Sequence, residues 1–211
     1  MKDSEKNDIE FLGQPKPSSL AMQFCNIADP GTALDLELGD GGNALFLASK
    51  GFEVIALESS QEKIERVLKT ADNQSLSIDF RNTDLKKFQF HKNRYSLIMA
   101  DHIFQHHKKS AVHDLAAKIC YGLKKGGVLI GAALTVDDPA YKEMCRKRIP
   151  MIEDKCFMSP GGWIYSFFGP REILQIFTDL KILHYSETEF YDSQIGQSQW
   201  HGLVEFAFKK V

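Results

Sequence analysis

The sequence predicts an α/β fold built on a doubly wound, mostly parallel sheet. Five short apolar runs alternate with segments of helical periodicity up to residue 134, and a glycine-containing turn joins the first run to a helix. Two further alternating runs close the chain, so we expect seven strands, the last two forming an antiparallel pair. Helical crossovers between parallel strands are right-handed, and this order therefore places helices on both faces of the sheet.

A strand, a glycine turn, a helix and a second strand are expected within Ala33–Glu58. Gly39 and Gly41 permit a sharp turn and leave the main chain open to a ligand, which the N–H groups of the following helix also face. Glu58 ends the second strand about 20 residues later, where an acidic side chain accepts hydrogen bonds from ribose hydroxyls. The pattern is typical of half of a nucleotide-binding βαβ unit.

The segment before this unit is expected to be peripheral. Residues 1–17 are charged and interrupted by Pro15 and Pro17, which predicts a flexible N-terminal tail. Ser18–Ala28 can form a helix with one apolar face, and Asp29–Gly31 turns the chain into the first strand. The chain has 211 residues, of which 43% are hydrophobic and 26% charged, so we expect residues 18–211 to form one globular domain.

Strands and helices continue to alternate after Glu58. Ser59 and Glu62 have the spacing of a capping box, which predicts the start of a helix. Ser110 is expected to cap a later helix that Gly122 ends. The third, fourth and fifth strands are expected at Leu76–Phe80, Tyr95–Ala100 and Val128–Leu134.

The C-terminal third follows a different pattern. Residues 137–168 contain three prolines, a glycine pair and a basic cluster, and we interpret them as an insertion or lid carried on the core. Pro170 is placed to start a helix at its first position. The closing strands are expected at Lys181–Tyr191 and Gly202–Lys209.

Charge and cysteine content limit the classes of function. A net charge of -2 and a pI near 6.4 give no general attraction to nucleic acid, and no apolar run approaches the ~18 residues of a membrane span. The N-terminus lacks the pattern of a signal peptide, so we expect a cytoplasmic protein with reduced thiols and no zinc or disulfide framework. The sequence gives no indication of oligomeric state. Its four cysteines are Cys25, Cys120, Cys145 and Cys156.

Several motifs resemble those of the class I S-adenosylmethionine-dependent methyltransferases, whose sheet is Rossmann-like. The first is Asp35–Gly41, an acidic residue followed by alternating glycines. The run Asn43–Val54 is most similar to the tellurite-resistance and thiopurine-type branch, whose members methylate small, soft nucleophiles. The resemblance covers about Pro17–Leu134, and the C-terminal third of the chain matches the family only in its pattern of elements. Its other motifs are Glu58, Asp84–Leu85, Tyr95–Asp101 and Leu123–Ile130.

The resemblance implies S-adenosyl-L-methionine as cofactor and a small molecule as methyl acceptor. The glycines would pass under the methionine moiety, and Asp35 would hold its amino group. Glu58 would bind both ribose hydroxyls, Asp84 the adenine amino group, and Asp101 would border the transferred methyl. The implied cofactor-binding residues are Asp35, Glu37, Gly39, Asp40, Gly41, Glu58, Ser59, Asp84, Leu85 and Asp101.

One residue departs from the family pattern. Glu37 stands where the family usually has its first glycine, and its carboxylate could attract the ammonium or the sulfonium, or occupy the space of the cofactor. We therefore expect weakened or altered cofactor binding. A degenerate scaffold that binds a ligand or partner without catalysis is the alternative function.

Two other interpretations of the motifs remain open. Gly39, Gly41 and Ala44 also satisfy the dinucleotide fingerprint of nicotinamide-dependent oxidoreductases, although Asp35 and Asp84 argue against that class. Metal binding by His102 and His106, which would share one face of a helix, lacks an evident third ligand, so no metal site is predicted.

Candidate residues for the reaction itself follow the fourth strand. His106 could act as a general base or contact the acceptor, whereas His102 and His107 are interpreted as residues at the pocket rim. The basic cluster within residues 142–148 suits either a solvated helix face or an anion-binding lid. Four aromatic residues suit either core packing or a pocket wall: Trp163, Tyr165, Phe167 and Phe168. The role of two polar residues at the last strand, His201 and Glu205, is left open.

Overall fold

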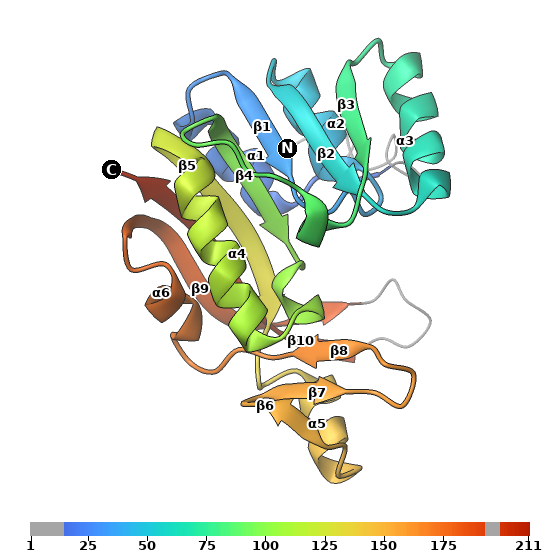
Figure 1. Cartoon of the computed structure of the whole chain (residues 1–211), viewed down its shortest axis with the longest axis vertical. Helices are drawn as coiled ribbons and strands as arrows, with labels where there is room; N and C mark the ends of the chain where they lie inside the picture. Colours follow the sequence, from blue (N-terminus) through green and yellow to red (C-terminus); the bar gives the residue numbers. More distant parts are fainter. Residues whose placement is uncertain (1–14, 193–198) are drawn as a thin grey trace, which may run out of the picture.

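The computed structural model describes residues 15–192 and 199–211, and in it a seven-stranded sheet forms the centre of the molecule (Figure 1). The strand order is β3-β2-β1-β4-β5-β10-β9, in which the first five strands are parallel and β10 runs antiparallel to both neighbours. This confirms the predicted mostly parallel sheet with an antiparallel C-terminal pair. The strands of this sheet are β1 (Thr32–Asp35), β2 (Glu53–Glu58), β3 (Ile78–Asn82), β4 (Tyr95–Asp101), β5 (Leu123–Leu134), β9 (Leu180–Asp192) and β10 (Gln199–Lys210).

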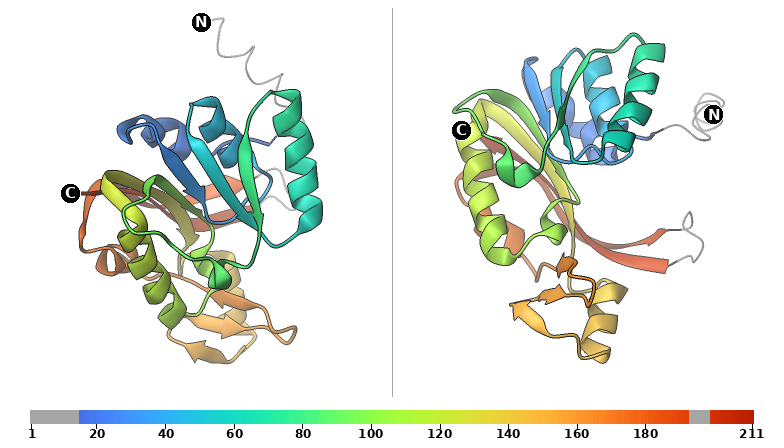
Figure 2. Two further views of the ribbon diagram at one scale, coloured as in Figure 1. Left: turned by 45° about the horizontal axis from the view of Figure 1, so that its top comes forward. Right: turned by 45° about the vertical axis from the view of Figure 1, so that its right-hand side comes forward.

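Helices cover both faces of the sheet, which is the doubly wound arrangement expected (Figure 2). One face packs against α1 (Ser19–Phe24), α2 (Gly42–Ser49) and α3 (Gln61–Asn73), and the other against α4 (Lys109–Gly122) and α6 (Glu172–Ile176). Successive strand residues point to opposite faces, so the central strands are apolar on both sides. In β4, for example, Met99 packs with the α1–α3 layer and Ile98 with the α4 layer. Short 3-10 helices complete this part at η1 (Cys25–Ile27), η2 (Leu85–Lys87) and η3 (Phe104–His106).

Two local expectations after β2 need correction. The cap of α3 is Ser60 and not Ser59, because the Glu58 carboxylate accepts the Ser60 N–H at 2.8 Å and the Ser60 hydroxyl is then placed to accept the Lys63 N–H at 3.3 Å. The third strand starts at Ile78, two residues later than predicted, because Leu76 N–H still bonds to the Ala71 carbonyl at the end of α3.

Later elements also begin at other residues than predicted. Ser110 lies inside the first turn of α4 and does not cap it. The fifth strand, expected to start at Val128, starts at Leu123, because a bulge that contains Gly126 at φ +81° lies within β5. Pro170 precedes α6 by two residues, since Arg171 adopts a left-handed conformation at the helix cap.

Residues 137–168, the segment expected as an insertion and called the insertion below, form a small folded unit at the end of the sheet (Figure 1). It contains α5 (Pro139–Arg146) and an antiparallel sheet of β6 (Met151–Glu153), β7 (Cys156–Met158) and β8 (Ile164–Ser166). Its core is an aromatic cluster of Tyr141, Phe157 and Phe167, with ring centroids 5.4 to 6.1 Å apart. Phe168 is also buried, packed edge-on against Phe104 of the main core, so Phe167 and Phe168 are core residues.

Most of the predicted N-terminal tail, residues 1–14, lies outside the described residues. The chain just after it is packed. A Cβ on Gly42 would lie 2.1 Å from the Lys16 carbonyl oxygen, and Ser18 N–H donates to the Asn43 side chain at 2.8 Å. Within the described chain, none of the helices has the length and apolar character needed to cross a membrane.

Candidate functional site

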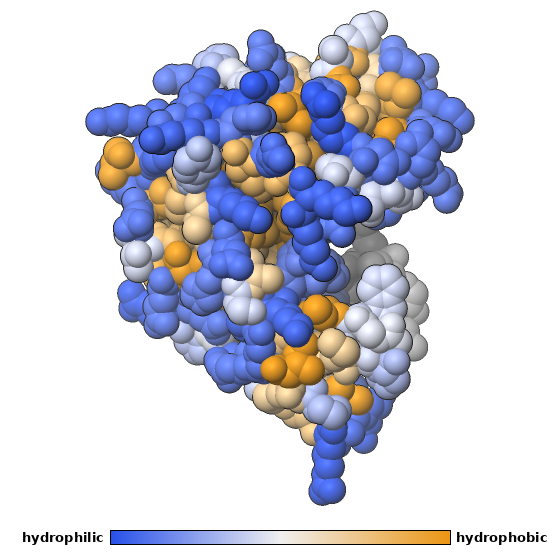
Figure 3. All heavy atoms as spheres, in the orientation of Figure 1, coloured by the Kyte–Doolittle hydropathy of each residue, from blue (hydrophilic) through white to orange (hydrophobic). Residues whose placement is uncertain are grey.

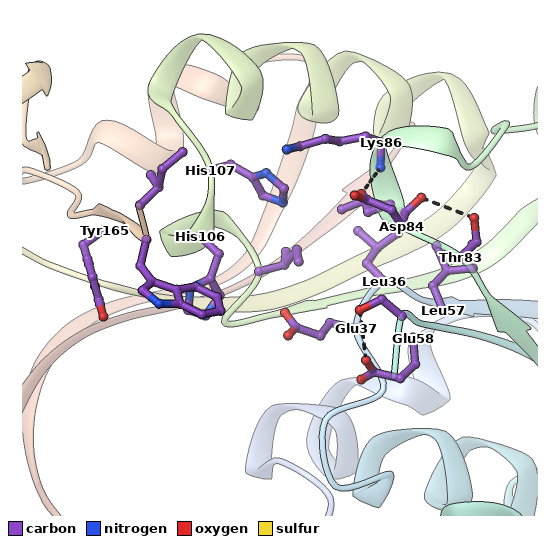
Figure 4. Close-up of a pocket in the computed structure, with 15 residues that line it drawn as sticks. Leu36, Glu37, Leu57, Glu58, Thr83, Asp84, Lys86, His106, His107 and Tyr165 are labelled. Carbon is purple, nitrogen blue, oxygen red and sulfur yellow. Dashed lines mark hydrogen bonds between the residues drawn. The ribbon is translucent and has the colours of Figure 1, made fainter. Parts of the chain in front are cut away.

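A pocket of about 410 Å³ opens at the carboxyl ends of the parallel strands, facing the insertion (Figures 3 and 4). This edge is where ligands bind in open α/β sheets, and the volume falls within the range of small-molecule sites. Its walls come from the ends of β1, β2 and β3, from η3 and from β8. The lining residues are Leu36, Glu37, Leu57, Glu58, Ser59, Thr83, Asp84, Leu85, Lys86, Ile103, His106, His107, Trp163, Ile164 and Tyr165.

Asp35 ends β1 and is almost fully buried, with 2% of its surface exposed. Its Oδ1 accepts the Glu37 N–H at 3.4 Å, whereas Oδ2 is buried with no hydrogen-bond partner among the described residues. Burial raises the pKa of this carboxyl well above its usual value, and the neighbouring Asp101 and Glu37 raise it further. An orphaned buried acceptor is costly to the fold and suits a donor group of a ligand.

The glycine turn has the conformation that its residues permit. Gly39 and Gly41 have φ values of +57° and +91°, which side chains rarely allow. A Cβ built on Gly39 would meet no described atom within 4 Å, so the main chain is open on that side. Asp40 is exposed and its Oδ1 accepts the Gly42 N–H at 2.9 Å, so its observed contact orders the start of α2.

Glu58 closes β2 with its carboxylate at the pocket and only 6% of its surface exposed. The Ser60 N–H and the Ser59 hydroxyl donate to Oε1 at 2.8 and 3.4 Å, and Lys63 Nζ lies 3.3 Å from Oε2. These contacts fix the carboxylate and keep its charge balanced. The Lys63 contact was not predicted, although a lysine five residues after a strand-ending acid is a usable signal.

Asp84 and Leu85 lie where β3 leads into η2. Asp84 Oδ1 accepts the Lys86 N–H at 2.8 Å, and Leu85 packs partly against the main core. Thr83 and Lys86 flank them in the pocket lining and were missed in the sequence, where no pattern distinguishes them from solvated loop residues. The predicted pair thus lies in the pocket with Glu58.

Asp101, Gly39 and Gly41 are not among the residues that line the pocket. Asn43 of α2 donates from Nδ2 to Asp101 Oδ2 at 3.1 Å, and Asn43 Oδ1 accepts the Ser18 N–H at 2.8 Å. This chain of bonds joins the segment before α1, the start of α2 and the end of β4. Asn43 was not predicted as a site residue.

The three histidines after β4 are placed differently from one another. His106 and His107 line the pocket, and burial lowers the pKa of His107. His102 adopts a left-handed φ of +53° before η3, so it does not share a helical face with His106. Among the described residues, no group of three histidine, cysteine, aspartate or glutamate side chains could hold a metal ion.

Glu37 projects its side chain into the pocket, between Glu58 and His106 (Figure 4). Burial raises the pKa of its carboxyl, an effect opposed mainly by His106 and Lys63. The labelled carboxylates therefore follow one another along the pocket, with Asp84 first, Glu58 next and Glu37 nearest to His106. A ligand with several donors and a positive charge fits this lining.

The insertion contributes an aromatic wall, because Trp163 and Tyr165 line the pocket from β8 and the turn before it. Trp163 is 71% exposed, so its ring lies at the pocket mouth. The basic cluster lies on the last turns of α5 and the two residues after it, outside this lining. Arg146 and Lys147 contact Glu143 at 2.7 and 3.1 Å. These contacts favour a solvated helix face.

His201 is also outside the pocket lining. Its Nδ1 lies 2.9 Å from Oδ2 of Asp138, which is 1% exposed and caps α5 through Oδ1. The pair joins β10 to the insertion. Glu205 is half-buried in β10 and does not line the pocket either.

Solved structures of methyltransferases have the same fold as this chain. The crystal structure of TehB from Haemophilus influenzae matches with a TM-score of 0.69 at 18% identity, covering 90% of this chain and 61% of that one. A structure of an S-adenosylmethionine-dependent methyltransferase from Methanosarcina mazei matches with a TM-score of 0.70 at 20% identity, covering 90% and 97%.

Sequence comparison points the same way. A probable S-adenosyl-L-methionine-dependent methyltransferase TehB from Haemophilus influenzae is 26% identical over 168 residues, which are 79% of this chain and 51% of that protein. The chain thus spans about half the length of the curated relatives it matches. The model of the tellurite resistance protein TehB family matches residues 16–144, more than half of the sequence. On this match, the chain belongs to the TehB family.

Proposed function

We propose that this chain transfers a methyl group from S-adenosylmethionine to a small-molecule acceptor in the cytoplasm. The observation that carries the proposal is the line of carboxylates from Asp84 to Glu37 beside a buried Asp35 with an unpartnered oxygen. The family of the chain and the printed name of its Haemophilus relative support it.

The residues present fit an adenosyl ligand. Asp84 can accept from the adenine amino group, and the buried Glu58 can accept from both ribose hydroxyls. The orphaned Oδ2 of Asp35 suits the ammonium, and the open main chain at Gly39 leaves room beside it. Each of these groups is an acceptor, as a ligand with this many donors requires.

The bound sulfonium would supply an electrophilic methyl group, and the chain would supply alignment. Methyl transfer is an in-line displacement, so positioning the acceptor accounts for most of what the protein can do. His106 and the aromatic wall at Trp163 and Tyr165 border the open end of the pocket, where an acceptor would bind. His106 can take a proton from a neutral acceptor, and an anionic one needs no base.

Isothermal titration with S-adenosylmethionine, S-adenosylhomocysteine and NAD tests the proposal. Micromolar binding of both adenosyl ligands and no binding of NAD is expected, with Glu58→Gln weakening both. Binding of NAD alone would place the chain among oxidoreductases, and binding of no ligand would favour a scaffold without the cofactor.

Turnover is tested separately. Methyl transfer from labelled S-adenosylmethionine to a panel of small acceptors should be detectable, and His106→Ala should lower it for neutral acceptors only. Cofactor binding with no turnover on any acceptor would favour the degenerate scaffold. Full activity of the variant on a neutral acceptor would remove His106 from the reaction.

A further inference from the structure

The side chain of Glu37 is directed by its two neighbours. Leu36 N–H donates to the Met99 carbonyl at 3.1 Å, and Leu38 N–H donates to the Leu57 carbonyl at 2.9 Å. Both leucine side chains are buried, at 2% and 3% exposure. Because the main chain is fixed on both sides, the Cα–Cβ bond of Glu37 is held toward the pocket that the side chain lines.

The charge of Glu37 is not neutralised by direct contact. In the described parts of the chain, no hydrogen bond or ion pair reaches its carboxylate, and the nearby Lys63 is paired with Glu58. A half-buried carboxylate without a partner is unfavourable unless a ligand compensates it. Glu37 therefore suits a positive charge in the pocket.

The order of residues along the pocket indicates where that charge would lie. Asp84 and Glu58 would bind the adenine and the ribose, and Glu37 comes next toward His106 (Figure 4). The sulfur of the proposed ligand follows the ribose and precedes the acceptor. Asp84, Glu58 and Asp35 would all contact groups that the substrate and the product share.

Resting on the proposed function, we infer that Glu37 is a specificity-determining residue that favours the sulfonium substrate over the neutral thioether product. S-Adenosylmethionine and S-adenosylhomocysteine differ by one methyl group and one positive charge, so only a group near sulfur can separate them. A carboxylate near the sulfur attracts the positive charge of S-adenosylmethionine, whereas the sulfur of S-adenosylhomocysteine carries no charge for it to attract. Product inhibition is correspondingly weak.

The experiment is titration calorimetry of the full chain and two Glu37 variants with both ligands. The unmodified chain should bind S-adenosylmethionine about tenfold more tightly than S-adenosylhomocysteine, or ~1.4 kcal/mol. Glu37→Gln keeps the shape of the side chain and should weaken the binding of S-adenosylmethionine, which brings the two dissociation constants close together. Glu37→Gly should remove the preference as well.

A matched control separates charge from general loss of affinity. Asp84→Asn should weaken both ligands by the same factor, because Asp84 would contact a shared group. An unchanged ratio in Glu37→Gln, or an equal gain for both ligands in Glu37→Gly, would overturn the inference and leave the proposed function intact. If the unmodified chain bound neither ligand, both would fail.

Discussion

Glu153 of the insertion accepts two hydrogen bonds from Ser110 in the first turn of α4, from the backbone N–H at 3.0 Å and from the hydroxyl at 2.8 Å. The cap residue of α4, Lys108, provides no side-chain cap, so a segment 43 residues away supplies the acceptor. Lys109 adds contacts to the Phe167 carbonyl at 2.6 Å and to Glu172 at 2.7 Å. The insertion is thereby fastened to the helix that follows the pocket histidines.

Replacing Glu153 by Ala should loosen this attachment. Hydrogen exchange at the Ser110 amide and through β6 and β7 should become faster, because the acceptor is lost. The Ser110 bonds lower the pKa of Glu153, so the cap is present above the ordinary pKa near 4.5 and is lost as pH falls through the lowered value. The control is Glu143→Ala, because Glu143 contacts only Arg146 and Lys147, one helical turn away, in the ion pairs that the structure describes. Equal exchange in the two variants would contradict the capping role.

Asp35→Asn should stabilise the fold and weaken ligand binding. The buried, unpartnered carboxylate penalises the folded state when ionised, by about 1 to 3 kcal/mol for an unsatisfied group. Its folded pKa is raised, so the penalty is absent below the unfolded pKa and grows as pH rises toward the folded value. Denaturant unfolding at pH 5 and pH 8 should show a larger gain at pH 8. A variant less stable than the original at both values would refute this account.

Substitutions of Glu58 and Lys63 should affect ligand affinity differently. Glu58→Gln removes a charged acceptor of the ribose hydroxyls and should weaken S-adenosylhomocysteine binding about 10- to 100-fold, the range of lost charge-assisted hydrogen bonds. Lys63→Met removes the cation 3.3 Å from the same carboxylate and should leave affinity equal or higher. Calorimetry on both variants measures this. Loss of affinity in Lys63→Met would mean that the lysine itself contacts the ligand.

Trp163 offers a reporter for the insertion. The sequence has two tryptophans, so Trp200→Phe leaves Trp163, exposed at the pocket mouth, as the single tryptophan, which can be excited selectively at long wavelength. Saturating S-adenosylhomocysteine should shift its emission to shorter wavelength, because a ligand beneath it excludes water. The companion variant Trp163→Phe, which reports on Trp200, should show no shift. A response confined to Trp200 would place the ligand elsewhere.

The fold and much of the pocket could be predicted because they depend on local patterns. The glycine turn, the acid closing β2 and the aspartate after β3 are short-range signals, and the structure brings Glu58, Asp84 and Leu85 into one pocket. Contacts between distant segments could not be predicted. No periodicity announces that Glu153 caps α4, that Lys16 packs on Gly42, or that Asn43 bridges Ser18 and Asp101.

Helix starts were missed for a related reason. Ser59 and Ser60 could each have capped α3, and the Glu58 carboxylate selects Ser60 by accepting its N–H. At α4, Ser110 lies inside the first turn and donates to Glu153, a carboxylate outside the helix. Capping propensity is local, but competition for a donor depends on the tertiary structure.

The sheet divides the apolar interior into two hydrophobic clusters, one on each face, that support different parts of the molecule. One contains Leu38 and Val67 and supports the glycine turn, and the other contains Phe104 and Phe168 and joins the insertion to the sheet. Distant sites with no shared partners usually have additive effects on stability. Substitutions around Phe104 and Phe168 should therefore add to those around Leu38 and Val67 without strong coupling, so the support of the insertion can change while the support of the glycine turn stays intact. A change at one end of the molecule then need not disturb the other.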